Sequence, residues 1–126
     1  MSDEQDAEMQ QAALKRRLEK EGFAAIHREA KAAAEAAAND MLKRLGGDRM
    51  ACGFAWVNVY GVKLSTKKGK EMMAVGFRKS YQGGIELWNP SGSPVQNVDI
   101  KEAGAQAYAN VLKRYGFEAY AASRLD

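Results

Sequence analysis

The clearest hydrophobic pattern in the chain lies near residues 96–116 and predicts a helix from Asp99 to Tyr115. Small and apolar side chains recur there at helical spacing and would form one face of that helix. They are Ile100, Ala103, Gly104, Ala107, Val111 and Tyr115. Asp99 is expected to cap the first turn, Glu102 to reach back to it, and Gly116 to end the helix. Because the face is rich in small residues, we expect this helix to cover a sheet closely.

The first third of the chain has a helical pattern with a weaker hydrophobic face. From about residue 10 to residue 45, strong helix formers dominate and no proline interrupts them. The stripe consists of Leu14, Leu18, Phe23, Ile26, Ala30, Ala33, Ala37, Met41 and Leu45. One long helix bent at Gly22 and two separate helices both fit, and Gly46-Gly47 ends the region. An alanine-rich stripe needs a partner, and both the rest of the chain and a second copy, which would make a dimer, remain open.

Beyond residue 51 the pattern changes to the two-residue alternation of β-strands. Phe54, Trp56, Asn58 and Tyr60 alternate with smaller residues and predict the first strand. Further strands are predicted at Glu71–Arg78, Ile85–Trp88 and Phe117–Ala121. Turns are predicted at Lys67–Lys70 and Tyr81–Gly84, and Asn89–Pro94 has the composition of a loop.

These elements predict an α+β fold. A long N-terminal helix is followed by a β-β-β-α-β unit with a mostly antiparallel sheet covered on one face by one helix. Residues 1–47 are expected to form a helical extension and residues 48–126 the α+β core domain. A chain of 126 residues is long enough for one such core.

Composition and charge indicate the compartment of the protein and the kind of partner it could bind. The single cysteine, Cys52, excludes an internal disulfide and fits a reducing compartment. No apolar run approaches the length that crosses a bilayer, so we expect a cytoplasmic protein without membrane contact. The formal net charge is only +3, but residues 49–79 contain seven basic residues and a single acidic residue, Glu71. This basic block is the informative feature of the charge pattern.

The basic block and nearby aromatic residues predict a nucleic-acid-binding β-hairpin. Cationic side chains can neutralise phosphates, and aromatic rings can stack on bases. The candidate phosphate-binding residues are Lys63, Lys67, Lys68, Lys70, Arg78 and Lys79, and the candidate stacking residues are Tyr60, Tyr81 and Trp88. The alternative is a solvated lysine turn beside aromatic residues that fill the core.

Catalytic and metal-binding patterns are weak, so we expect no enzyme, no metal and no cofactor. His27 is the only histidine, and its place in the middle of a helix indicates a surface side chain. Cys52 is expected to be a small buried thiol at the start of a strand. One histidine and one cysteine are too few for a zinc site from this chain alone.

Four stretches of the sequence resemble small uncharacterised bacteriophage proteins. They are Cys52–Val57, Trp88–Gly92, Gln96–Ala105 and Ser123–Asp126. The resemblance implies a phage origin and a host-cytoplasmic setting, and it names no activity. Arg124 and Asp126, after the last predicted strand, could form an ion pair or a recognition edge, or could belong to a frayed terminus.

Residues 42–115 also resemble the double-stranded-RNA-binding domain in the order of their predicted elements. A helix, three antiparallel strands and a closing helix that opens on Lys101-Glu102-Ala103 carry this resemblance. Lys101 stands where that family has a lysine cluster. The resemblance implies recognition of duplex shape across the grooves.

Two function hypotheses follow. The first is a non-enzymatic phage-type accessory protein that binds nucleic acid through the basic hairpin. The second is a host-takeover or counter-defence protein that binds a host or defence protein, or sequesters a small nucleotide signal. In that second case the N-terminal helix or the loop at Asn89–Gln96 would make the contact.

Overall fold

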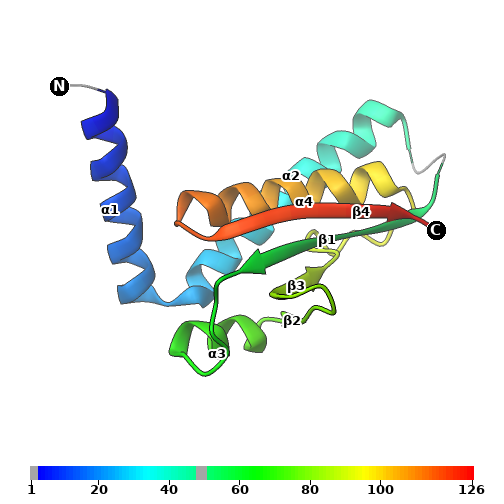
Figure 1. Cartoon of the computed structure of the whole chain (residues 1–126). Coiled ribbons are helices and arrows are strands. Elements are labelled where there is room, and N and C mark those ends of the chain that lie inside the picture. Colours follow the sequence, from blue (N-terminus) through cyan, green and yellow to red (C-terminus); the bar gives the residue numbers. More distant parts are fainter. Residues whose placement is uncertain (1–2, 48–50) are drawn as a thin grey trace.

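The computed structural model describes residues 3–47 and 51–126. These residues contain four helices and four strands, joined by loops (Figure 1). The elements in chain order are α1 (Asp3–Glu21), α2 (Phe23–Leu45), β1 (Gly53–Tyr60), α3 (Lys67–Ala74), β2 (Arg78–Lys79), β3 (Ile85–Trp88), α4 (Val98–Arg114) and β4 (Glu118–Leu125). The predicted α+β class is therefore confirmed.

The four strands form one antiparallel sheet in the order β2-β3-β1-β4. Trp56 of β1 lies opposite Trp88 of β3, and Phe54 lies opposite Arg124 of β4. Helices α2 and α4 lie on the same side of this sheet, and α4 runs alongside β1 and β4 (Figure 1). The sheet therefore has one covered face and one face that these helices leave open.

The core lies between the sheet and the two helices. Phe23, Ile26 and Ala30 of α2 are fully buried beside Tyr108 and Leu112 of α4. Helix α2 thus belongs to the core in space, whereas α1 projects from the rest of the domain (Figure 1) and packs against the core through Leu14 and Leu18. The predicted division after residue 47 falls at residues 48–50, which lie outside the described residues.

The N-terminal region consists of two helices, not one bent helix. Gly22 separates them with φ of 79°, a left-handed backbone conformation that glycine adopts without strain. Arg17 holds α1 against the core, because its guanidinium donates to Glu29 Oε1 at 2.9 Å and to the Tyr115 hydroxyl at 2.8 Å. The Tyr115 hydroxyl in turn donates to Glu29 Oε1 at 2.7 Å. Gly46 ends α2 in a left-handed conformation, as the sequence predicts.

The predicted strand at Glu71–Arg78 and the predicted turn at Lys67–Lys70 are wrong. Residues Lys67–Ala74 form α3, and β2 is reduced to Arg78–Lys79. Thr66 caps the helix by accepting a hydrogen bond from the Gly69 N–H at 3.1 Å. Met72 is fully buried in the core, which fixes α3 against the domain. The predicted basic β-hairpin therefore does not exist.

Helix α4 differs from the prediction in its cap and in the role of its small residues. The cap is Asn97, whose side chain accepts from the Ile100 N–H at 3.1 Å, and Asp99 lies in the first turn. Gly104 lies against Ser91 of the loop and the backbone of α2, not against the sheet. The last strand, β4, also runs beyond the predicted Phe117–Ala121 to Leu125.

Candidate nucleic-acid interface

Strand β1 divides its side chains by size between the two faces of the sheet. Ala55, Val57 and Val59 point to the covered face and are buried. The intervening positions point to the open face, because successive side chains of a strand alternate in direction. Phe54 and Trp56 therefore lie on the open face, where Phe54 is 37% exposed.

Neighbouring strands add further aromatic side chains to the open face. Trp88 of β3 is 43% exposed and stacks on Trp56 with ring centroids 4.8 Å apart and an interplanar angle of 23°. Phe54 meets Trp88 edge to face at 6.0 Å. The Arg124 guanidinium of β4 lies 5.4 Å from the Phe54 ring centroid and 5.9 Å from that of Trp88. One cation thus lies over two exposed rings.

A second aromatic pair lies toward the other end of β1. Tyr60 and Tyr120 approach to 6.1 Å between ring centroids, and Tyr120 is 48% exposed. The Lys113 ammonium of α4 lies 5.4 Å from the centre of the Tyr120 ring. We name the whole set the aromatic sheet face. It consists of Phe54, Trp56, Tyr60, Trp88, Tyr120 and Arg124.

The turn between β2 and β3 makes a hollow beside the tryptophan pair. This hollow has a volume of about 270 Å³ and is lined by Trp56, Ser80, Tyr81, Gln82, Glu86, Trp88 and Arg124. The Tyr81 ring is fully exposed at its rim. The Trp88 indole N–H donates to Glu86 Oε1 at 2.8 Å, which fixes one edge of the ring, while one face of the ring stacks on Trp56.

The predicted site residues fall in three places. Tyr60 and Trp88 lie on the aromatic sheet face, and Tyr81 lines the hollow beside it. Arg78 and Lys79 form the short strand β2, which pairs with β3 at this side of the sheet. The remaining lysines are separate from the aromatic sheet face: Lys63 lies in the β1–α3 loop, and Lys67, Lys68 and Lys70 lie on α3.

Sequence reasoning missed Phe54, Trp56 and Tyr120 as site residues, and it named Arg124 as one part of a candidate recognition edge at the C-terminus. The signal for the first two was present, because β1 alternates large aromatic residues with alanine and valine. Lys101, which the resemblance to duplex-RNA-binding domains singled out, is buried and donates to the Gly53 carbonyl oxygen at 3.0 Å. Its ammonium lies 5.7 Å from the centre of the Phe54 ring and helps to orient that ring.

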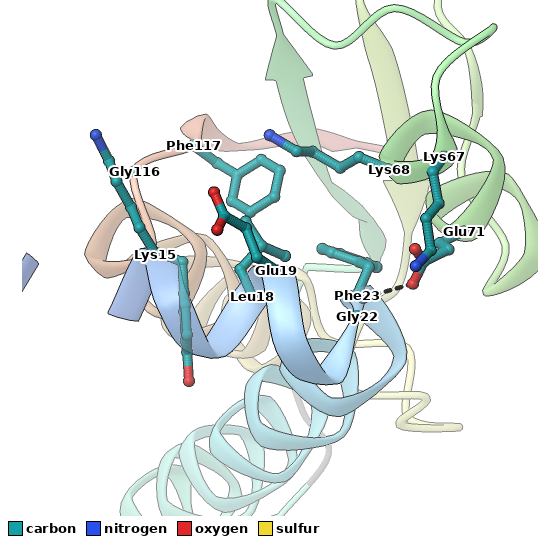
Figure 2. Close-up of a pocket in the computed structure, with 11 residues that line it drawn as sticks. Lys15, Leu18, Glu19, Gly22, Phe23, Lys67, Lys68, Glu71, Gly116 and Phe117 are labelled. Atoms are coloured by element: carbon teal, nitrogen blue, oxygen red, sulfur yellow. Dashed lines mark hydrogen bonds between the residues drawn. The ribbon is translucent and has the colours of Figure 1, made fainter. Parts of the chain in front are cut away.

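A separate pocket lies where α1 meets α3 and the α4–β4 turn (Figure 2). Its volume is about 540 Å³, and three lysines, Lys15, Lys67 and Lys68, line it. The Lys68 ammonium lies 5.1 Å from the centre of the Phe117 ring, which forms part of the wall. Glu71 faces the same pocket and accepts from the Phe23 N–H at 2.7 Å (Figure 2).

Two predictions about reactive side chains are wrong. His27 is partly buried, and its Nδ1 lies 2.8 Å from the hydroxyl of buried Tyr108. Burial lowers the pKa of His27, nearby Lys31 lowers it further, and burial raises the pKa of Tyr108 far above its usual value. Cys52 is exposed, not buried.

Metal-ligand clusters and membrane-spanning helices are both absent from the described part of the chain. Within residues 3–47 and 51–126, no three histidine, cysteine, aspartate or glutamate residues gather where they could hold a metal ion. No helix among those residues is long and apolar enough to span a bilayer.

Comparison with known proteins identifies no family for this chain. No family model matches the chain, and neither the curated proteins nor the solved structures contain a match. The resemblances to bacteriophage proteins and to duplex-RNA-binding domains therefore stay predictions.

Proposed function

We propose that this protein is a non-enzymatic binding protein that holds single-stranded nucleic acid on the aromatic sheet face. The observation that carries the proposal is the Trp56–Trp88 stack on the open face, with Trp88 exposed and Arg124 over the rings of Phe54 and Trp88. Unpaired bases stack on such rings, whereas bases in a duplex are already stacked on one another. A four-stranded antiparallel sheet with exposed aromatic residues is one common way of binding single-stranded RNA.

Charge around the aromatic sheet face favours an anionic strand. Arg124 lies on the face itself, Lys113 reaches Tyr120, and Arg78 lies at the β2 edge, so three cations accompany the two carboxylates of this face, Glu86 and Glu118. The Arg78 guanidinium is anchored by the Phe77 carbonyl oxygen at 2.8 Å, which positions it beside the sheet. These cations can contact phosphates while the rings contact bases, and such contacts weaken with salt.

The test is fluorescence anisotropy of labelled single-stranded and duplex DNA and RNA at two salt concentrations. We expect single strands to bind more tightly than duplexes, and Trp88→Ala to weaken binding about 5- to 150-fold, since one base stack contributes about 1–3 kcal/mol. Trp88 is partly exposed, so its loss should leave the fold intact.

The matched control removes charge away from the aromatic sheet face. Replacing Lys67, Lys68 and Lys70 with alanine should weaken binding much less than Trp88→Ala, because all three lie on α3. If the lysine variant abolishes binding and Trp88→Ala does not, the lysine-based site predicted from the sequence is favoured instead. If no strand binds at low salt, the proposal is wrong, and a host or defence protein becomes the better partner.

A second candidate function is capture of a small phosphate-bearing molecule in the lysine-lined pocket. Its volume of about 540 Å³ lies within the usual range for ligand sites. Lys15, Lys67 and Lys68 outnumber the two lining carboxylates, Glu19 and Glu71, and Phe117 supplies an aromatic wall. This arrangement supports the alternative that the protein sequesters a nucleotide.

Calorimetry with guanosine monophosphate and with inorganic phosphate tests this candidate. Binding should be lost when Lys15 and Lys68 are both replaced by alanine, and kept in the Lys43→Ala control on α2, away from the pocket. Binding that survives the double replacement, or no binding at all, would rule the pocket out as such a site.

A further inference from the structure

Strand β4 is a long strand at the edge of the sheet. It has eight residues, whereas the opposite edge strand, β2, has two. An edge strand of this length presents a row of backbone groups that can pair with another chain. Proline and bulges, which often protect such edges, are absent from Glu118–Leu125, and its pairing with β1 is regular.

Hydrogen-bond alternation shows which residues of β4 face outward. The Asp126 N–H donates to the Cys52 carbonyl oxygen at 3.0 Å, in register with the β1–β4 pairing. Because bonded and non-bonded pairs alternate along an antiparallel ladder, even-numbered residues of β4 bond to β1. The N–H and C=O groups of Ala119, Ala121 and Ser123 therefore point away from β1, in the plane of the sheet. Ala121 and Ser123 are partly exposed, whereas Ala119 is buried in the single chain.

We infer that β4 pairs antiparallel with β4 of a second copy of this chain, about a twofold axis at Ala121. This register joins the outward backbone groups of both strands. It also places Glu118 directly opposite Arg124 of the second copy, and Tyr120 opposite Ala122. Moving the axis to Ala122 would instead set Glu118 against Asp126. Only the register at Ala121 gives two opposite-charge pairs on the open face.

Two side chains have to move for this pairing: Lys113, and Arg124, whose guanidinium lies over the Phe54 and Trp88 rings on the side of β4 away from its free edge. Lys113 belongs to α4 on the covered face, yet its ammonium lies over the Tyr120 ring on the open face, so it passes around the edge of β4. Lys113 is exposed and can turn into solvent. The side chains of Ala119, Ala121 and Ala122 are small and leave room for a second strand.

Pairing at β4 would join two sheets into one and double the aromatic sheet face. Tyr120 of both copies would lie beside the axis. Trp56, opposite Ala122, would lie one strand farther out, and Trp88 two strands farther out. A single strand could then cross both copies. Pairing through β4 uses the strand edge and the Glu118–Arg124 charges, and it does not require that nucleic acid binds.

Sedimentation equilibrium without nucleic acid tests this pairing with variants that reverse the charge of Glu118 or of Arg124. The native chain should sediment at twice its mass of 13.8 kDa. Glu118→Arg and Arg124→Glu should each shift the mass toward a single chain, because like charges then face each other twice. An equal mixture of the two variants should recover the doubled mass, because both facing pairs become opposite in charge.

Two further variants distinguish an interface at the β4 edge from an interface elsewhere on the surface. Ala121→Pro removes an outward N–H and should abolish pairing while leaving the circular dichroism of the fold unchanged. Trp88→Ala should keep the doubled mass, since it lies on the face and not at the edge. A native chain that stays single, a doubled mass that neither charge variant lowers, or a mixture that fails to recover it would overturn the inference.

Discussion

Replacing Gly104 with alanine tests how closely α4 approaches its neighbours. Alanine stabilises a helix interior by about 1 kcal/mol relative to glycine, so helix propensity alone predicts a more stable protein. The added Cβ would lie 2.8 Å from Ser91 Cβ and 3.3 Å from the Ala34 carbonyl oxygen. Contacts this close force a shift of the loop, and such overpacking costs about 1–3 kcal/mol. The net expectation is a loss of between about 0 and 2 kcal/mol in the free energy of unfolding.

The assay is urea unfolding followed by far-UV circular dichroism. Ala103→Gly is the control for helix propensity at the adjacent, less crowded position, and it should cost about 1 kcal/mol. Adding Ser91→Gly to Gly104→Ala removes the closest atoms, so the double-mutant cycle should show a favourable coupling of about 0.5–3 kcal/mol. A Gly104→Ala protein that gains about 1 kcal/mol, or a coupling of zero, would refute the reasoning.

Three shorter predictions concern pH, α1 and α3. Because the pKa of His27 is lowered in the folded protein, the unfolded chain binds a proton first, and the urea midpoint should fall as pH drops below about 6.5; His27→Gln should flatten this fall. Glu29→Gln removes the charge that Arg17 contacts, so hydrogen exchange measured by mass spectrometry should become faster in α1 and stay unchanged in the middle of α2. Met72→Ala should lower the free energy of unfolding by about 2–5 kcal/mol, since the side chain is fully buried under α3; a loss below about 0.5 kcal/mol would contradict that placement.

The sequence predicts the fold class well because several of its signals are local. Periodicity at residues 99–115 and alternation at residues 54–60 each identify an element without reference to the rest of the chain. The prediction for Lys67–Ala74 was wrong because the apolar residues of this segment are contiguous, and such a run fits a strand as well as a short helix. Thr66 followed by helix formers was the signal that could have corrected it.

The candidate site was harder to predict because both faces of β1 carry large apolar side chains, with Asn58 the polar exception. Alternation separates the aromatic side chains from the alanine and valine side chains, but it does not say which set is covered. Tyr108 of α4 and Tyr115, which follows α4, decide this, since both rings are buried in the core and pack on the face that carries the small side chains. Their hydroxyls find partners in His27 and Glu29, two contacts that join residues 81 and 86 positions apart in the chain.

The tryptophan stack also gives the protein an optical signal of its own. The chain contains two tryptophans, and both belong to the Trp56–Trp88 stack on the open face. Emission from these indoles therefore reports on the sheet surface and not on the helical core. Coupled transitions of two rings 4.8 Å apart should give a near-ultraviolet dichroism band that disappears when either ring is removed. Any molecule that covers this face should change both signals, so its binding can be followed without attaching a dye.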